Sequence, residues 1–414
     1  MISQALTTYR GECKLPGGKL VAVSVQLNPQ VFLTRGASHV EHCQIDGDFF
    51  IDAARDQLNI LKALEREIEN IVLPLAEGDI NGRLEAVINR YKDSYLIGIN
   101  ANTITLALIR ALTQVPGYPT NTIDGHLHTR TDLLDRILTL DDFTNAQTSD
   151  FFDRWGQLPL NVIMDVEREP AEQIGLDLAM LQAVDRGEQP PSLRIWQWAS
   201  PAVVIGRFQS LHNEVHVARA HELGFTVVRR MSGGGAMFAE PDRVITYSLY
   251  LPISFASGLN RTLTYYLCDV WLLKGLEHLG ITAGWTGMND IASPKGKIGG
   301  SAQRRLPVHP GRVGAFLHHD MLSYSIDADK MVQVLNTSDE KVVDKAVRSA
   351  KARIDPLERQ TRLSRKQLTE ALVATLPDIA PATRLSVVNE QMAVQGNELA
   401  AKYFCSTQWT ASII

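Results

Sequence analysis

The strongest candidate for chemistry is a run of three glycines that directly follows two arginines. The segment reads RRMSGGGA at residues 229–236 and comes after an apolar stretch with the pattern of a strand. Because glycines lack Cβ atoms, the backbone N–H groups of such a turn can approach a ligand and point at an anion. Arg229 and Arg230 add positive charge for a carboxylate or a phosphate. Taken alone, the same residues also fit a surface turn flanked by solvated arginines.

A second candidate combines an acidic residue with a lysine. Asn289 and Asp290 precede the segment KIGGSAQ, which begins at Lys297. The carboxylate of Asp290 could hold Mg²⁺, and Lys297 could reach an α-phosphate or a substrate carboxylate. Phosphoryl and adenylyl transfer need such an electrostatic cradle because charge builds up on oxygen atoms. A polar hairpin with Lys297 in solvent explains the spacing equally well.

Two further polar segments adjoin expected strands. Gly206 and Arg207 follow one strand, and the pair His318-His319 lies within another. Adjacent residues of a strand point to opposite faces, so the two histidines cannot bind one metal ion without distortion. We expect one histidine to be buried and hydrogen-bonded and the other to lie at the rim of the site. The chain has no GxSxG elbow, so a Ser-His-Asp hydrolase is not indicated. It also has no Walker A sequence and no GxGxxG fingerprint.

Positioning these segments requires alternating strands and helices, which predicts an α+β fold with a mixed sheet flanked by helices. The expected strands are 193–198, 202–205, 225–228, 244–251 and 315–326. The expected helices are 174–184, 215–223, 262–279 and 368–376. Ser364 and Gln367 form a capping box before the last helix.

A length of 414 residues makes two domains the default expectation. We expect a small α+β domain at residues 1–113. A linker with one short helix near 133–140 is expected at residues 114–155. The catalytic domain, with a helical tail, is expected at residues 156–414. In the first domain we expect strands at 19–27 and 95–99 and helices at 58–68 and 103–112.

Composition restricts the function classes. The net charge of −5 argues against nucleic-acid binding as the main role. The sequence has neither an apolar run long enough for a transmembrane helix nor a signal peptide, so we expect no membrane association and a cytoplasmic location. The scattered residues Cys13, Cys43, Cys268 and Cys405 fit neither a zinc site nor a disulfide framework.

The ordered motifs resemble the lipoate–protein ligase family of the biotin/lipoate ligase superfamily. RRMSGGGAMF, NDI and KIGGSAQ carry the resemblance, supported by WASPAVVIGRFQS, FLHHDMLSYSID and the tail AAKYFCSTQW, over roughly residues 156–414. GECKLPGGKLVAVSV, IDGDFFID and LIGINANTITLALIRAL resemble the accessory domain of these ligases. That domain usually follows the catalytic one and here comes first.

This resemblance implies an ATP-dependent lipoate–protein ligase. Lipoic acid and Mg·ATP would give lipoyl-AMP, and a lysine of an acceptor such as a lipoyl domain would take the lipoyl group. Lys297 would bind the carboxylate and α-phosphate oxygens, and the accessory domain would serve adenylation. The residues implied for the lipoyl and adenylate pocket are Arg207, Arg230, Ser232, Gly233, Gly234, Gly235, Ala236, Gly300, Ser301, Ala302 and His319. Those implied for nucleotide and Mg²⁺ are Asn289 and Asp290, with Asp290 as the metal ligand.

One position departs from the family, because Ala239-Glu240 stands where members usually have a His-Asp pair. Three other functions stay open as alternatives. An octanoyltransferase or lipoyl amidotransferase on this fold forms a thioester on a cysteine. Residues 280–288 before the NDI segment contain no cysteine, and Cys268 is expected in a helix core, so the ligase is preferred. A non-catalytic binding homologue is the second alternative, and biotin ligase, whose GRGRRG-type loop is missing here, is the third. Neither the acceptor protein nor the preference for lipoate or octanoate can be predicted.

Overall fold

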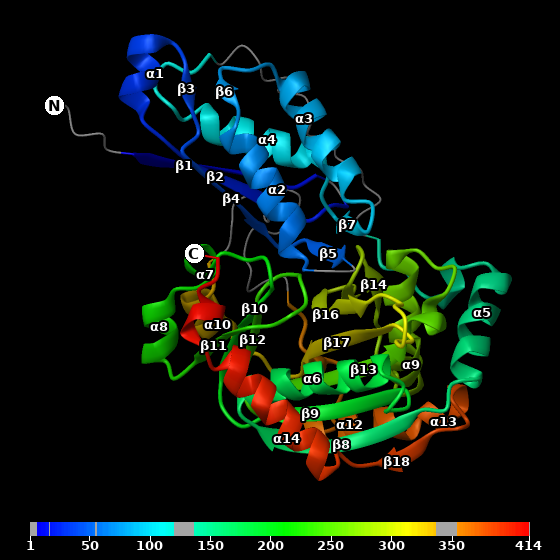
Figure 1. Cartoon of the computed structure of the whole chain (residues 1–414). Coiled ribbons are helices and arrows are strands. Elements are labelled where there is room, and N and C mark those ends of the chain that lie inside the picture. The colour runs from blue at the N-terminus through cyan, green and yellow to red at the C-terminus, as the bar shows by residue number, and fades with distance from the viewer. Residues whose placement is uncertain (1–5, 16, 54–55, 120–135, 337–353, 414) are drawn as a thin grey trace. The chain divides into compact units, whose positions relative to one another are not determined.

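The chain divides into two units in the computed structural model, which describes residues 6–15, 17–53, 56–119, 136–336 and 354–413 (Figure 1). Unit 1 comprises Met1–Thr131 with Phe208–Ser210 and Ser338–Lys345, and unit 2 comprises the remainder. The main division therefore falls inside the predicted linker 114–155. That segment contains α5 (Asn145–Gly156), which belongs to unit 2.

The prediction of a short helix near 133–140 is wrong for residues 136–140, the part of that range that the structure describes. Residues 133–135 lie outside the described part, and Leu138 forms an isolated antiparallel bridge with Trp285. The edge of a sheet therefore takes up an apolar segment that looked helical in isolation.

Unit 1 is built on an antiparallel sheet with helices packed against it. The sheet has the order β1-β2-β4, with β1 (Thr7–Cys13), β2 (Val21–Leu27) and β4 (His42–Gly47). Helix α4 (Ala101–Leu112) lies so close to β1 that a Cβ atom on Gly11 would come within 2.1 Å of the Ala107 carbonyl oxygen. The helices of unit 1 are α1 (Pro29–Arg35), α2 (Leu58–Glu69), α3 (Glu77–Arg90) and α4 (Ala101–Leu112). Its remaining strands are β3 (Ser38–His39), β5 (Phe50–Ala53), β6 (Val72–Leu73) and β7 (Ser94–Ile97).

Unit 2 is built around an eight-stranded mixed sheet with the order β14-β15-β16-β17-β13-β9-β8-β18. Strand β8 pairs in parallel with β9 and with β18, and the other neighbours are antiparallel. The strands are β8 (Asn161–Arg168), β9 (Ser192–Trp198), β13 (Val244–Pro252), β14 (Gly284–Thr286), β15 (Asp290–Ser293), β16 (Gly296–Leu306), β17 (Ala315–Ser323) and β18 (Arg384–Ser386). A smaller sheet holds β10 (Ala202–Ile205) between β11 (Thr226–Arg229) and β12 (Met237–Ala239).

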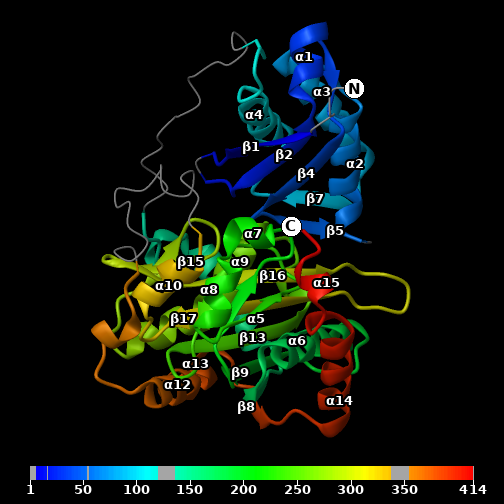
Figure 2. The same ribbon diagram turned by 90° about the vertical axis from the view of Figure 1, so that its left-hand side faces the viewer.

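Two long helices cover the opposite faces of the large sheet. On one face, Tyr250 of β13 and Leu317 of β17 pack with α6 (Pro170–Asp185). On the other, Tyr247 and His318 contact Asp269 of α9 (Arg261–His278). Alternate residues of β13 and β17 therefore face different helices, as the two-residue period of a strand requires. Figure 2 shows the sheet of unit 2 between these helices.

The other helices of unit 2 surround this layered arrangement. They are α5, α7 (Leu211–Glu214), α8 (Val217–Glu222), α10 (Ala328–Val334), α12 (Arg365–Ala374), α13 (Leu376–Ile379), α14 (Glu390–Leu399) and α15 (Thr407–Thr410), with a π-helical turn at Ala400–Phe404. Short 3₁₀ turns span Leu140–Asp142, Ile253–Ala256 and Leu357–Arg359. Helix α14 packs closely on α6: a Cβ atom on Gly175 would lie only 2.3 Å from the Gly396 carbonyl oxygen, so the contact requires glycine there.

The predicted fold class is confirmed, and each predicted strand and helix outside the linker has a counterpart at nearly the same residues. The capping box of Ser364 and Gln367 is present at the start of α12. Within the described residues, no helix is long and apolar enough to cross a membrane.

Candidate active site

The glycine loop between β11 and β12 is held from within by Arg230. Its guanidinium donates to the carbonyl oxygens of Gly233 at 2.6 Å, Gly235 at 2.9 Å and Val204 at 3.0 Å. Burial lowers the pKa of Arg230 to about 10, which still leaves it charged at neutral pH. Arg230 was expected to offer its charge to a ligand carboxylate or phosphate, and the structure instead uses most of its donors to fix the loop.

Close backbone packing explains why the loop is made of glycine. Gly234 has φ 91°, which other residues rarely adopt, and a Cβ atom on Gly206 would lie 2.0 Å from the Gly234 carbonyl oxygen. Within the described part of the chain, no group accepts a hydrogen bond from the backbone N–H of Gly233, Gly234 or Gly235. These N–H groups are therefore available to an anionic oxygen, as the sequence predicted.

Arg229 and Arg207 hold the C-terminal tail. The Arg229 side chain donates to the Thr410 carbonyl oxygen at 2.8 and 3.0 Å, and Trp409 Nε1 donates to the Arg229 carbonyl oxygen at 2.8 Å. The guanidinium of Arg207 lies 4.3 Å from the centroid of the Trp409 ring. Arg207 was predicted to line the adenylate pocket, and the structure places it against the tail instead.

A small cleft beside the glycine loop is lined by five apolar and five polar or charged side chains. Its polar groups include Asp177, Ser232 and His319. The remaining residues around it are Ile174, Leu178 and Leu181 of α6, Arg230 and Met231 before the glycines, Arg304 of β16 and Leu317 of β17. Three predicted pocket residues, Arg230, Ser232 and His319, therefore meet at one cleft.

A hydrogen-bonded chain of three side chains lies at this cleft. Ser232 Oγ is 2.7 Å from His319 Nε2, and His319 Nδ1 is 3.1 Å from Asp177 Oδ2. Arg230 Nε donates to Ser232 Oγ at 3.0 Å. Asp177 escaped the sequence analysis because it stands 142 residues from His319 in a helix with no motif around it.

The hydrogen bonds determine which groups carry protons. Because Arg230 Nε–H can only donate to Ser232 Oγ, the serine's own hydrogen is directed at His319 Nε2, and the ring proton lies on Nδ1 facing Asp177. Burial lowers the pKa of His319, with partial compensation by Asp177, so the ring is neutral near pH 7. Serine, imidazole and carboxylate are thus arranged as nucleophile, base and orienting group.

Asp177 stays ionised although it is fully buried. Burial would raise its pKa, but the charge of Arg194 and the hydrogen bonds from His319 and Tyr250 outweigh burial and lower the pKa below its usual value. Asp177 Oδ1 accepts hydrogen bonds from Arg194 Nη2 at 2.7 Å and from the Tyr250 hydroxyl at 2.6 Å. Arg194 also donates to Gln173 Oε1 at 3.0 Å, so the carboxylate is fixed from several sides.

Lys297 and Asp290 form an ion pair on the hairpin of β15 and β16. Lys297 Nζ is 2.7 Å from Asp290 Oδ1, and the lysine side chain is 45% exposed. The pair lies over Gly300, where a Cβ atom would come within 2.9 Å of both Nζ and Oδ1. The predicted glycine is therefore required for space beneath the lysine rather than for contact with a ligand.

Strand register places this ion pair on the same face of the sheet as His319. Asp290 stands opposite Gly300, Gly300 opposite Met321, and Ala302 opposite His319. Directly opposed residues share a face, and so do residues two apart on one strand. Lys297 and the Ser232–His319 pair therefore belong to one surface, with the Gly300 and Ala302 rows about 7 Å apart along β16.

Asn289 and Ser301 brace the hairpin. Asn289 Nδ2 donates to the Ser301 carbonyl oxygen at 2.5 Å, and Ser301 Oγ donates to the Asn289 carbonyl oxygen at 3.2 Å. The nucleotide contact predicted for Asn289 stays a prediction.

The residues present fit Mg²⁺ poorly at Asp290. Its Oδ1 already accepts a hydrogen bond from the Lys297 ammonium, whereas Mg²⁺ is bound through carboxylate oxygens and substrate phosphates. In the described residues, the one group that could supply three ligand atoms is Asp269, His318 and Asp320. Both ring nitrogens of His318 are occupied there, by Gln303 at 3.1 Å and Asp269 at 2.7 Å. We therefore derive no step through a metal ion.

The two adjacent histidines point to opposite faces, as predicted. His318 is buried against Asp269 of α9, and His319 reaches Ser232 at the cleft. Ala239, in the position of the family histidine, is fully buried in β12 opposite Ala202, and the following Glu240 binds Lys330 at 2.8 Å.

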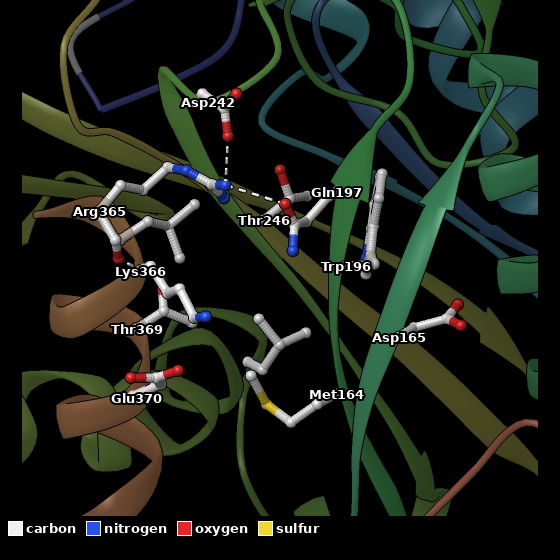
Figure 3. A pocket seen from close by; sticks show the side chains of 12 residues that line it. Met164, Asp165, Trp196, Gln197, Asp242, Thr246, Arg365, Lys366, Thr369 and Glu370 are labelled. Atoms are coloured by element: carbon white, nitrogen blue, oxygen red, sulfur yellow. Dashed lines mark hydrogen bonds and ion pairs between the residues drawn. The ribbon is translucent and has the colours of Figure 1, made fainter.

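A second hollow of about 360 Å³ lies between α12 and the strands β8, β9 and β13 (Figure 3). At its edge Arg365 donates to Gln197 Oε1 at 2.9 Å and to Asp242 Oδ1 at 2.6 Å. None of the predicted site residues lines this hollow, so it lies away from the chemistry described above.

No cysteine lines the cleft. The four cysteines all lie in the described part of the chain and none is in a disulfide; Cys13, Cys43 and Cys268 are buried, and Cys405 is exposed in the C-terminal tail. Burial raises the pKa of Cys268 well above its usual value, so its thiol is protonated within α9. Its expected role as a core residue fits this burial.

Fold and cleft together define an enzyme of the class that ligates or transfers lipoyl-type groups. The family model "Lipoyl protein ligase A/B catalytic domain" matches residues 169–377, and the chain belongs to this family. The computed structure superposes on a bipartite lipoate protein ligase of Thermoplasma acidophilum with a TM-score of 0.53 and 22% identity, over 62% of this chain and 98% of the other. A lipoate-protein ligase A bound with ATP gives 0.52 and 19%, over 61% and 99%. At these identities the likeness establishes the fold alone.

Curated relatives carry the name octanoyltransferase LipM. The protein from Symbiobacterium thermophilum is 30% identical over 196 residues, covering 42% of this chain and 68% of the relative. That from Macrococcus caseolyticus is 27% identical over 207 residues, covering 44% and 72%. The expected function, ATP-dependent lipoate ligation, is therefore wrong, and the transferase alternative is favoured. The missing cysteine was weighted too heavily.

Proposed function

We propose that the protein is an octanoyltransferase, which moves an octanoyl group from an activated donor to a lysine amine of a carrier protein. The observation that carries this proposal is the likeness to proteins named octanoyltransferase LipM. The family model, over residues 169–377, includes the residues of the cleft. The donor is an octanoyl thioester, since a transferase that uses no nucleotide needs an acyl group activated beforehand. The acceptor is a carrier of the lipoyl-domain type.

The cleft offers hydrocarbon to an aliphatic acyl chain, but it encloses only about 10 Å³, so its side chains have to move apart to admit one. Leu178 and Leu181 of α6 and Leu317 of β17 present hydrocarbon, which an octanoyl chain covers with loss of apolar surface from water. The polar residues Ser232 and His319 lie at the same cleft, where the acyl carbonyl has to react. An octanoyl group, with a saturated chain and a reactive carbonyl at one end, matches this combination of apolar and polar side chains.

Lys297 supplies positive charge to the reaction. Its ammonium lies on the face of the sheet that carries His319 and pairs with Asp290. Charge develops on the carbonyl oxygen during acyl transfer, and a cation or backbone N–H groups fixed nearby stabilise it. The N–H groups of Gly233 to Gly235 serve the same oxygen.

The test is an acceptor-modification assay with two donors. The full chain is incubated with an apo lipoyl domain and either an octanoyl thioester, or free octanoate with ATP and Mg²⁺. Intact-mass spectrometry of the acceptor should show one octanoyl group on its lysine with the thioester, at the same rate with or without ATP and Mg²⁺. ATP and Mg²⁺ were expected as cofactors from the sequence, and the second donor tests that expectation directly.

The variant that tests the role of the charge is Lys297→Ala, which removes a half-exposed ammonium and leaves the core packing in place. We expect it to lower the transfer rate about 100-fold, as loss of one charge-stabilising donor does elsewhere. Modification that requires ATP and free octanoate, with none from the thioester, would overturn the proposed function.

A further inference from the structure

The proposed transfer lacks a thiol at the place where the reaction has to occur. Cys268, the buried cysteine of unit 2, lies on α9, which covers the face of the sheet opposite to His319. Cys13 and Cys43 belong to the core of unit 1, and Cys405 is exposed in the tail. No cysteine is among the residues around the cleft, so a covalent step there needs another nucleophile.

Ser232 has the surroundings of such a nucleophile. Its hydroxyl is 2.7 Å from a neutral imidazole nitrogen, and the other nitrogen of that ring faces the ionised Asp177. A hydroxyl is a weak nucleophile until a positioned base removes its proton, and an adjacent carboxylate keeps the base in the correct tautomer. Ser232 is 1% exposed, so the side chains around the cleft have to move apart before a thioester reaches its hydroxyl, and an ester formed there is shielded from bulk water.

Arg230 stabilises the deprotonated serine. Its Nε–H donates to Ser232 Oγ at 3.0 Å, and its remaining bonds to the loop carbonyls prevent it from turning away. A hydrogen bond from a cation favours an anionic oxygen over a neutral one. The network therefore lowers the free energy of the serine alkoxide as it forms.

Resting on the proposed octanoyl transfer, we propose that Ser232 carries the acyl group as an oxygen ester, with His319 as the base and Asp177 as its positioning residue. Ser232 Oγ attacks the thioester carbonyl while its proton passes to His319 Nε2. The C–S bond breaks, and the leaving thiolate takes that proton. The neutral acceptor amine then attacks the ester and gives its extra proton to His319. The C–O bond breaks, and the proton returns to Ser232 Oγ.

The experiment traps the intermediate. The full chain is incubated with octanoyl thioester without acceptor, and its intact mass and peptides are measured before and after treatment with neutral hydroxylamine, which cleaves thioesters and spares oxygen esters. We expect one octanoyl group on the peptide that contains Ser232, stable to hydroxylamine. Ser232→Ala should lose the adduct and slow acceptor modification about 100- to 10,000-fold, while Ser364→Ala, a helix-capping serine outside the cleft, should keep both.

Ser232→Cys distinguishes chemistry from structure. A thiol at this position should take up the octanoyl group as a thioester that hydroxylamine removes, which a merely structural serine would not produce. Wild-type transfer with the adduct on a cysteine, or undiminished transfer by Ser232→Ala, would overturn the serine assignment and leave the proposed function standing. Failure of the proposed function itself would appear as no acceptor modification by the wild-type protein from the thioester.

Discussion

A buried aspartate fixes the chemistry of the candidate site at the scale of single residues. Asp177 accepts hydrogen bonds from Arg194, Tyr250 and His319, and its charge keeps the His319 proton on Nδ1. Without that charge, the imidazole could hold its proton on Nε2 and would no longer accept the serine hydrogen.

Asp177→Asn should therefore slow acyl transfer while leaving the apolar cleft in place. We expect a loss of about 100-fold or more in kcat with little change in KM for the thioester, because the substitution affects proton transfer and not binding. Steady-state kinetics measures both constants. A rise in KM with an unchanged kcat would mean that Asp177 acts on binding.

The same carboxylate gives a pH dependence of stability. Its pKa in the folded protein lies below the ordinary value of 3.8, so its stabilising contribution is complete above pH 3.8 and disappears as the pH falls through the lower folded-state pKa. Denaturant unfolding of the wild-type protein at decreasing pH should show this loss. Asp177→Asn, which cannot titrate, should show a smaller decrease over the same acid range.

At the scale of elements, the α6–β9 contact depends on one buried ion pair. The side chain of Arg194 in β9 is fully buried, and it binds Asp177 of α6 and Asp165 of β8. Removing one partner of a buried pair leaves an uncompensated charge and costs about 3–5 kcal/mol. Arg194→Met should lower the free energy of unfolding by that amount in urea titrations.

The matched control is the exposed pair of Arg219 and Glu222, whose side chains are 44% and 64% exposed. Glu222→Ala should change stability by about 1 kcal/mol or less. Similar losses from the two substitutions would contradict the role assigned to the buried pair.

Hairpin geometry makes a second prediction at this scale. A methyl group on Gly300 would lie 2.9 Å from both Lys297 Nζ and Asp290 Oδ1, so Gly300→Ala should displace the lysine and slow acyl transfer. Gly82→Ala is a suitable control because its Cβ atom would meet nothing within 4 Å. Transfer by Gly300→Ala at the wild-type rate would show that the position of Lys297 is unimportant.

The sequence predicted these elements better than the contacts between them. Runs of mostly apolar residues located α6, α9, β13 and β17, which are buried along almost their whole length. Strands β8, β14, β15 and β16 were not predicted; β14 and β15 have only three and four residues, and β16 begins with GKIGGS, which is typical of a turn. The bond between Ser232 and His319, 87 residues apart, depends on tertiary packing and has no local signal.

At the scale of the whole molecule, unit 1 and unit 2 contain separate apolar cores. Leu64 of α2 is fully buried in the core of unit 1, and the residues of the cleft all belong to unit 2. The accessory role predicted for residues 1–113 stays a prediction. The separate cores have a measurable consequence, because each unit should unfold in its own thermal transition.

Leu64→Ala should destabilise unit 1 by about 2–5 kcal/mol through loss of buried hydrocarbon and creation of a cavity. Differential scanning calorimetry should show one transition shifted to lower temperature and the other unchanged. A single unfolding transition that moves as a whole to lower temperature would mean that the two cores unfold cooperatively.

The most direct test of acyl transfer through the cleft is a single-turnover chase. The octanoylated protein is separated from its donor and mixed with an apo lipoyl domain in rapid-quench flow. The octanoyl group should leave Ser232 and appear on the acceptor lysine at least as fast as the steady-state kcat, with no thioester or ATP present. An isolated octanoyl-protein that stays unchanged while the acceptor remains unmodified would contradict the account.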